Sequence, residues 1–297
     1  MSVIYSFLRR RCRIPPGLAG SLGFAITIAL FMAGGTPALA HEVWIQPHSP
    51  QVKDGAPVTA DLRIGDMFVG NHLLYIPQQT ERVAILGAGG MTDYVPRVGS
   101  RPVIDLGADL LDGLTGHAVL IYQSADSYVH YMHQDKFFDF VTKKGAADIP
   151  GAHARRGLPP GGFIERYKRF AKSSITIGAP DETVNDRATG MEVEFVLTGR
   201  SLMADGTRRL NVRLFYKGAP LPGAVVALFT RRPDGEVATT GLVTGSDGIV
   251  GVAALPGHDY LLDHVTIRPI DPATDKNKAV WESLWASLTF SGAQLGN

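Results

Sequence analysis

His41 is the residue whose position most clearly suggests chemistry. It follows Ala38-Leu39-Ala40, in which two small residues form the A-x-A pattern of a signal-peptide cleavage site. Cleavage after Ala40 would leave His41 as the first residue of the mature chain. Its α-amine and its imidazole could then close a chelate ring on one metal ion, whereas an internal histidine offers only a ring nitrogen. We therefore predict a transition-metal ligand at the processed N-terminus.

The residues before His41 have the order of a secretory signal. A basic cluster at Arg9-Arg10-Arg11 and Arg13 precedes an apolar run from about Leu18 to Met32, and the cleavage site follows. An uncleaved membrane anchor is the alternative, because the run approaches spanning length. The A-L-A site favours cleavage. We therefore predict that residues 1–40 are a signal peptide, and that the mature protein is periplasmic and does not span the membrane.

Composition limits the ligands and the partners. Removal of the leader leaves 257 of the 297 residues, with 25 basic and 28 acidic side chains and a net charge of about −3. This balance gives no electrostatic basis for binding nucleic acid or an anionic membrane. Cys12 is the only cysteine and leaves with the leader. A metal site must therefore use nitrogen and oxygen ligands, and imidazole suits nickel, cobalt, copper and zinc.

The other eight histidines are the source of a second ligand, because a chelate from one residue is weak by itself. His264 is the first candidate and lies on a predicted strand. His130 and His133 are three residues apart, so they face opposite sides of a strand but share a face at the start of a helix. The sequence leaves that choice open. The five weaker candidates are His48 in a turn, His117 at the start of a strand, and His72, His153 and His258 in loops.

Short strands must position these side chains. In the first half of the mature chain, apolar and polar residues alternate between turns that carry Gly, Asp and Pro. The strands predicted there are 43–47, 57–65, 83–86, 103–106, 116–124, 127–132 and 173–177. Strands at this spacing favour an antiparallel sandwich over a parallel α/β sheet.

Two short helical inserts are predicted between these strands. Residues 136–144 place Phe137, Phe140 and Val141 at i, i+3 and i+4, with Asp135 as N-cap and Gly145 as the stop. Residues 164–172 repeat the pattern. Their charged residues, which include Glu165 and Arg169, are explained as the solvated face of that helix. The segment between the inserts, which contains His153 and Arg156, is predicted to be irregular.

The second half shows the clearest strand pattern. A polar stretch at 179–190 is predicted to link an N-terminal domain (41–178) to a C-terminal domain (191–297). Strands predicted beyond it are 211–216, 224–230, 236–244, 249–255, 260–268 and 282–290, several of them joined by Asp-Gly turns. Residues 218–225, 234–235, 244–249 and 256–260 resemble the motifs of a transthyretin-like or carboxypeptidase-regulatory-like Ig fold. We therefore predict a mostly β protein of two antiparallel, Ig-like sandwiches.

Four stretches resemble a bacterial envelope family classed as a domain of unknown function, DUF4198. They are the opening His41-Glu42-Val43-Trp44-Ile45-Gln46-Pro47, the helical segment from Asp135 to Gly145, the segment Glu165-Arg166-Tyr167-Lys168-Arg169-Phe170-Ala171-Lys172, and the ending from Trp281 to Phe290. Together they span the mature chain in the family's order.

The resemblance implies a function. Members of this family are described as periplasmic components of cobalt or nickel uptake systems, which implies a nickel or cobalt ion as ligand and an inner-membrane permease as partner. In the family pattern a histidine often occupies the position of Thr266. Here His264 lies two residues earlier, and the two positions share a face of a strand. The identity of the second ligand is therefore open.

Two other functions compete with metal uptake. A processed N-terminal histidine with a second histidine on a β-sandwich also describes the copper brace of oxidative polysaccharide-cleaving enzymes. The other alternative is a non-catalytic envelope module that binds a protein or glycan and no metal. The sequence contains no G-x-S-x-G, P-loop or H-E-x-x-H motif and no nucleophilic cysteine in the mature chain, so we do not predict an enzyme.

Overall fold

The protein is described by a computed structural model that covers residues 41–179, 184, 186–202 and 208–292. These residues belong to one compact unit, residues 38–297. The predicted signal peptide lies outside the described residues. In the described part of the chain, neither helix is long and apolar enough to cross a membrane.

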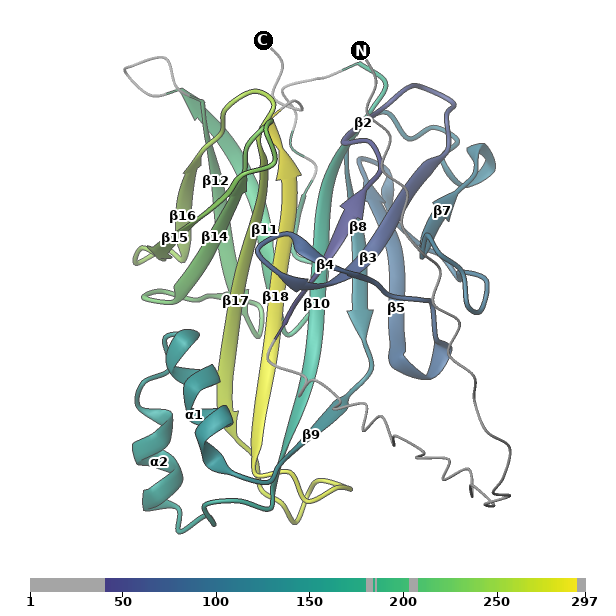
Figure 1. The fold of residues 1–297 in the computed structure, drawn as a ribbon. Helices are drawn as coiled ribbons and strands as arrows, with labels where there is room; N and C mark the ends of the chain where they lie inside the picture. The colour runs from purple at the N-terminus through teal and green to yellow at the C-terminus, as the bar shows by residue number, and fades with distance from the viewer. Residues whose placement is uncertain (1–40, 180–183, 185, 203–207, 293–297) are drawn as a thin grey trace, which may run out of the picture. The chain divides into compact units, whose positions relative to one another are not determined.

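The described chain is mostly β, as predicted, and forms three sheets (Figure 1). Sheet A contains β1 (Glu42–Pro47), β3 (Val58–Asp66), β4 (Val69–His72) and β7 (Ile104–Leu106). Sheet B has ten strands: β15 (Val237–Val243), β14 (Val225–Arg231), β17 (Asp259–Pro269), β18 (Trp281–Ser291), β10 (Phe163–Ile177), β8 (Gly116–Ser124), β5 (Thr80–Gly87) and β6 (Gly90–Asp93), with β2 (Gln51–Val52) and β9 (Ser127–Tyr131) also paired to β10. Sheet C contains β11 (Val193–Leu202), β12 (Arg208–Tyr216), β13 (Ala219–Pro220) and β16 (Ile249–Ala253).

Sheet B is the middle layer, because side chains from its two faces enter different cores. Successive residues of a strand point to opposite faces. Ala171 of β10 accordingly packs with Val43 and Ile45 of sheet A, whereas the preceding Phe170 packs with Val193 and Val212 of sheet C. Coverage on both faces explains why all nine residues of β8 and all eleven of β18 are buried.

One parallel contact joins the two halves of the chain. Most strand pairs are antiparallel, but β10 pairs with β18 in parallel, from Glu165 opposite Trp281 to Ser173 opposite Thr289. Sheet B therefore contains strands from both sides of the predicted linker. That linker is partly outside the described residues, and the division into two domains stays a prediction, as does the Ig-like resemblance.

The described residues form two α-helices, as predicted, but only one of them lies where the sequence predicted it. Helix α1 (Gln134–Lys143) is where it was predicted, although His133 rather than Asp135 is the residue before its first turn. The predicted helix at 164–172 is wrong, because these residues lie within strand β10. The second helix is α2 (Ile149–Arg155), in the segment predicted to be irregular. The single turns η1 (Pro77–Gln79) and η2 (Ala108–Leu110) complete the described elements.

Candidate functional site

The four stretches that carry the family resemblance meet around Lys144. Its Nζ donates to Glu42 Oε1 and to Asp263 Oδ2, both at 2.7 Å, and lies 4.8 Å from the centre of the Trp285 ring. Glu42 comes from β1, Lys144 from the end of α1, Asp263 from β17 and Trp285 from β18. We call these four residues the Lys144 cluster. The third family-like stretch, in β10, adds Arg169, whose guanidinium lies 5.6 Å from the centre of the Trp285 ring.

Helix α1 carries Lys144 to this position. The helix closes with the backbone N–H of Lys144 donating to Phe140 O at 3.1 Å and that of Gly145 donating to Thr142 O at 3.0 Å. One turn earlier, the Phe140 ring stacks on Trp285 with centroids 5.2 Å apart and an angle of 4° between the planes. Phe137 is buried in the same aromatic core. The apolar stripe of α1 thus fixes the helix on β18, and Lys144, the residue that caps its C-terminus, reaches Glu42 and Asp263.

Burial gives the Lys144 cluster unusual electrostatics. Glu42 is 4% and Asp263 is 2% exposed, and the two carboxylates share one ammonium group. Burial, and then the charge of Asp263, raises the pKa of Glu42 from 4.5 to about 7. Burial alone would lower the pKa of Lys144, but the charges and hydrogen bonds of Asp263 and Glu42 outweigh it, so that pKa is raised. Lys144 therefore keeps its charge.

One carboxylate oxygen of the cluster has no partner in the described part of the chain. Glu42 Oε2 is buried and accepts no hydrogen bond from any described residue. A buried oxygen of this kind is rare, because its desolvation is not offset, and it commonly indicates a water or an ion at the site. The arrangement can therefore take up a cation, either a proton or a metal ion, next to the N-terminal residue of the predicted mature chain.

Arg169 anchors His41 itself. Its Nη2 donates to the carbonyl oxygen of His41 at 3.2 Å, and its guanidinium lies 4.9 Å from the centre of the Tyr167 ring. The Nε of Arg169 is buried without a partner among the described residues. His41 is half-buried directly before β1, and Arg169 holds its backbone.

Glu165 extends the site along β10. It is 2% exposed, accepts a hydrogen bond from Tyr131 Oη at 2.8 Å and accepts another from Ser283 Oγ. Burial raises the pKa of Glu165 from 4.5 to about 7, against the effect of these hydrogen bonds. The explanation of Glu165 as part of a solvated helix face is wrong, because β10 places it inside the sheet.

The predicted metal ligands are not gathered in one place. His264 has both ring nitrogens engaged, since Nδ1 donates to Val225 O at 2.7 Å and Nε2 lies 3.0 Å from Thr266 Oγ1. Burial lowers the pKa of His264, so it is held neutral. Asp263, its neighbour on the opposite face of β17, is the residue that reaches the Lys144 cluster. His130 is exposed on β9, and His133 is exposed before α1.

The described side chains include no ready-made metal cage. Among them, no group of three or more His, Cys, Asp or Glu residues is arranged to hold a metal ion. A site at His41 would therefore depend on the α-amine that signal cleavage creates, a donor that side chains alone do not supply. His130, His133 and His264 stay predictions as further ligands.

Pairing between strands creates one histidine cluster that the sequence did not reveal. Asp61 Oδ2 lies 3.1 Å from His48 Nε2 and 3.0 Å from His72 Nδ1. Arg63 Nη1 is 3.0 Å from His72 Nε2, and arginine can only donate, so the proton of His72 is on Nδ1 and points to Asp61. The contacts arise because β1 and β4 pair with opposite sides of β3, and no spacing along the chain could indicate this.

The family assignment rests on the sequence profile of a family described as Domain of unknown function (DUF4198). That profile matches residues 38–267, which include all of sheet A and most of the Lys144 cluster. The chain belongs to the DUF4198 family. No curated protein matches the DUF4198 chain.

Solved structures give the DUF4198 chain only distant likenesses. One is a tetra-tandem repeat in the extending region of a large adhesion protein, at 11% identity and a TM-score of 0.21, over 85% of this chain and 50% of that one. Another is a DUF4785 family protein from Legionella pneumophila, at 10% identity and a TM-score of 0.22, over 74% of this chain and 50% of that one. A third is a Salmonella alpha-2-macroglobulin reacted with methylamine, at 12% identity and a TM-score of 0.20, over 89% of this chain and 15% of that one. The chain thus spans half or less of each.

Proposed function

We propose that this DUF4198 protein is a periplasmic transition-metal-binding protein that serves nickel- or cobalt-type uptake or handling. His41, released as the N-terminal residue by signal cleavage, is the central ligand. The observation that supports this most is the unpartnered, buried Oε2 of Glu42 immediately after His41. It offers an oxygen donor next to the two nitrogens of a processed N-terminal histidine.

The ligand set follows from donor chemistry. The α-amine and the imidazole of His41 supply two nitrogens, and Glu42 supplies an anionic oxygen. Arg169 holds the His41 carbonyl, which limits the motion of the chelating residue and so reduces the entropy lost on binding. Nitrogen ligands suit nickel and cobalt, but the general affinity order places copper first in a bare binding assay. Preference for nickel or cobalt would come from the uptake system, with an inner-membrane permease as the proposed partner.

Calorimetric titration of the protein with its native N-terminus tests the proposal. Ni²⁺, Co²⁺, Cu²⁺ and Zn²⁺ are titrated into protein purified from periplasm, into His41→Ala, into Glu42→Gln and into a form with one additional residue before His41. We expect metal binding by the native form, at least about tenfold weaker binding by Glu42→Gln, and loss of the high-affinity site in the other two.

His258→Ala is the matched control. His258 lies in the turn before β17, far from His41 and Glu42 in sequence, and its Nδ1 lies beside Pro256 O. Equal metal affinity of the native and the extended forms would show that the processed terminus is not the ligand. Oxygen consumption with bound copper and a reductant would favour the copper-brace enzyme instead.

A further inference from the structure

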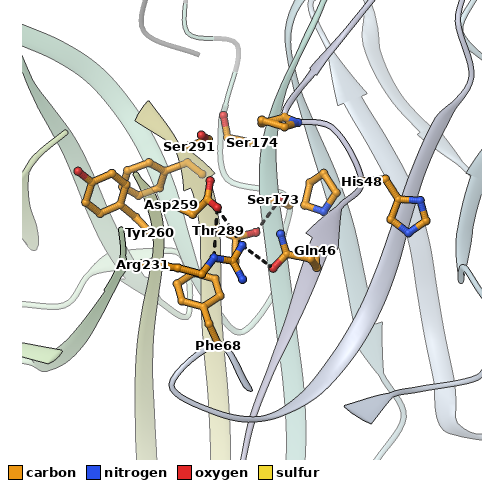
Figure 2. Close-up of a pocket in the computed structure, with 13 residues that line it drawn as sticks. Gln46, His48, Phe68, Ser173, Ser174, Arg231, Asp259, Tyr260, Thr289 and Ser291 are labelled. Carbon is orange, nitrogen blue, oxygen red and sulfur yellow. Dashed lines mark hydrogen bonds and ion pairs between the residues drawn. The ribbon is translucent and has the colours of Figure 1, made fainter. Parts of the chain in front are cut away.

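A second candidate site lies where β1 ends, between sheets A and B. It is a cavity of about 190 Å³. Its walls include Gln46 of β1, Phe68 of the β3–β4 turn, Arg231 of β14 and Asp259 of β17 (Figure 2). Gln46 is five residues beyond His41, which is roughly 16 Å along an extended strand at about 3.3 Å per residue. This cavity is therefore separate from the Lys144 cluster.

Arg231 is held in one orientation inside the cavity. Its Nε and Nη2 donate to Asp259 Oδ2 at 3.3 and 2.8 Å, and Nη2 lies 3.5 Å from Gln46 Oε1. The guanidinium carbon lies 4.6 Å from the centre of the Phe68 ring. Nη1 makes no hydrogen bond to a described residue. Asp259 thus fixes one edge of the guanidinium, and the Phe68 ring covers one face. With Nη1 left without a described partner, the group is preorganised to bind a hydrogen-bond acceptor.

Gln46 supplies further donors. Trp44 Nε1 donates to Gln46 Oε1 at 3.3 Å, on the same oxygen that Arg231 approaches. The amide nitrogen of Gln46 is therefore left with two N–H groups that no described residue accepts. The hydroxyls of Thr289 and Ser173 are already used, because Thr289 donates to Ile45 O and lies 2.7 Å from Ser173 Oγ. The polar groups that Arg231 and Gln46 leave without a described partner are therefore donors.

An unusual turn holds Phe68 under Arg231. Met67 and Phe68 both have positive φ, 49° and 60°, which a two-residue hairpin of type I′ requires and which Asn-Gly normally provides. Side chains without a local polar group seldom adopt this conformation. Phe68 is nevertheless buried, edge-on to Trp44 with centroids 6.0 Å apart. Such backbone strain at a cavity wall is typical of ligand sites, where it places a particular side chain.

We propose that this cavity binds a small organic molecule through its carboxylate, which accepts hydrogen bonds from Arg231 Nη1 and the Gln46 amide. Carboxylate oxygens accept several hydrogen bonds and pair strongly with guanidinium. An engineered cavity of about 150 Å³ holds benzene, so a 190 Å³ cavity has room for a ligand of roughly six to ten non-hydrogen atoms. Asp259 Oδ1 accepts no hydrogen bond from a described residue, and it is placed to receive an ammonium or hydroxyl group of the same ligand.

NMR titration tests this site with acetate, succinate and glycine as probes and with acetamide as the neutral comparison. We expect saturating shifts of the Gln46 side-chain amide and the Arg231 Nε–H with the three carboxylates, and much weaker effects with acetamide. Arg231→Met should weaken carboxylate binding by about tenfold or more, because a hydrogen bond to a charged group is lost. Asp259→Asn should strengthen it several-fold, because Arg231 loses its internal counter-charge.

Two further variants keep the test decisive. Gln46→Glu retains an oxygen for Trp44 and Arg231 but replaces the amide donors with a negative charge, so it should abolish carboxylate binding even if Arg231→Met does not fold. Arg232→Met is the matched control, since Arg232 is the next residue, exposed, and paired with Glu236. Equal binding of acetamide and acetate, equal loss in Arg232→Met, or no saturable shift with any carboxylate would overturn the proposal.

Discussion

At the scale of single residues, Lys144 decides whether the buried acids of the candidate site are tolerated. Its ammonium contacts both Glu42 and Asp263 at 2.7 Å, and both carboxylates are almost completely removed from water. A buried ion pair adds little to stability by itself, because desolvation offsets the attraction. Removal of one member is different, since it leaves the remaining charges buried and unpaired. The role of Lys144 is thus to keep two carboxylates in place.

Substitution of Lys144 measures this role directly. Lys144→Met keeps the length of the side chain but removes its charge, and we expect the free energy of unfolding to fall by about 3–5 kcal/mol at neutral pH. Urea denaturation followed by circular dichroism gives the value. Lys143→Met is the control, because Lys143 is the preceding residue on the exposed side of α1 and should change stability by less than about 0.5 kcal/mol. Equal effects of the two variants would contradict the assignment.

At the scale of elements, strand β10 changes what its charged residues do. A helix over residues 164–172 would have exposed them to water. As a strand between β8 or β9 and β18, β10 instead buries Glu165 on one face and Lys172 on the other. Lys172 donates to Asp186 Oδ1 at 3.0 Å and lies 2.9 Å from Glu194 Oε2, so it joins β10 to β11 and the segment before it. The charged side chains of β10 are thus buried or half-buried in the sheet and do not form the solvated face of a helix.

The burial of Glu165 on β10 predicts a pH dependence of stability. Because its pKa is raised from 4.5 to about 7 in the folded protein, the folded state binds the proton more tightly than the unfolded state does. The resulting stabilisation is complete below about pH 4.5 and is lost as the pH rises through about 7, a change of about 3 kcal/mol. Glu165→Gln cannot ionise but keeps an acceptor for Tyr131 and Ser283.

Urea unfolding at about pH 5 and about pH 8 tests this dependence. The fall in the free energy of unfolding between the two values should be smaller in Glu165→Gln than in the wild-type protein by about 3 kcal/mol. Glu81→Gln is a suitable control, since the Glu81 carboxylate is half-exposed beside Lys168. An unchanged pH profile in Glu165→Gln would show that Glu165 ionises normally in the folded protein.

At the scale of the whole described unit, sheet B makes the two halves of the chain depend on each other. β10 and β18 pair over nine residues, and two hydroxyls of β18 donate to β1, Ser287 Oγ to Val43 O and Thr289 Oγ1 to Ile45 O, each at 2.7 Å. Opening either half would therefore expose the other along a full strand edge and would leave buried polar groups without partners.

This interdependence predicts a single unfolding transition. Native-state hydrogen exchange should give the amides of β8, from the first half, and those of β17, from the second half, the same opening free energy within error. Far-UV circular dichroism and tryptophan fluorescence should show one common urea midpoint. Two separated midpoints would instead support two independently folding domains, as the polar stretch at 179–190 suggests in the sequence.

Local pattern determined much of this protein. The alternation of apolar and polar residues between Gly, Asp and Pro turns predicted most strands, because strand periodicity and turn chemistry act over a few residues. The apolar spacing of residues 136–144 predicted α1 for the same reason. The four family-like stretches also indicated where to look for a site, although they are far apart in the sequence.

Only the tertiary structure decided which residues share a site. Lys144 meets Glu42 and Asp263 across 102 and 119 residues, and such contacts depend on strand register and helix docking that no local period encodes. The same reason explains the error at β10, where buried charges resembled a solvated helix face because their partners lie elsewhere in the chain. It also explains why His264, the expected partner of His41, has both nitrogens engaged on the opposite face of β17 from Asp263. The sequence alone thus located His41, and the fold brought Arg169 to its carbonyl and Lys144 to the neighbouring Glu42.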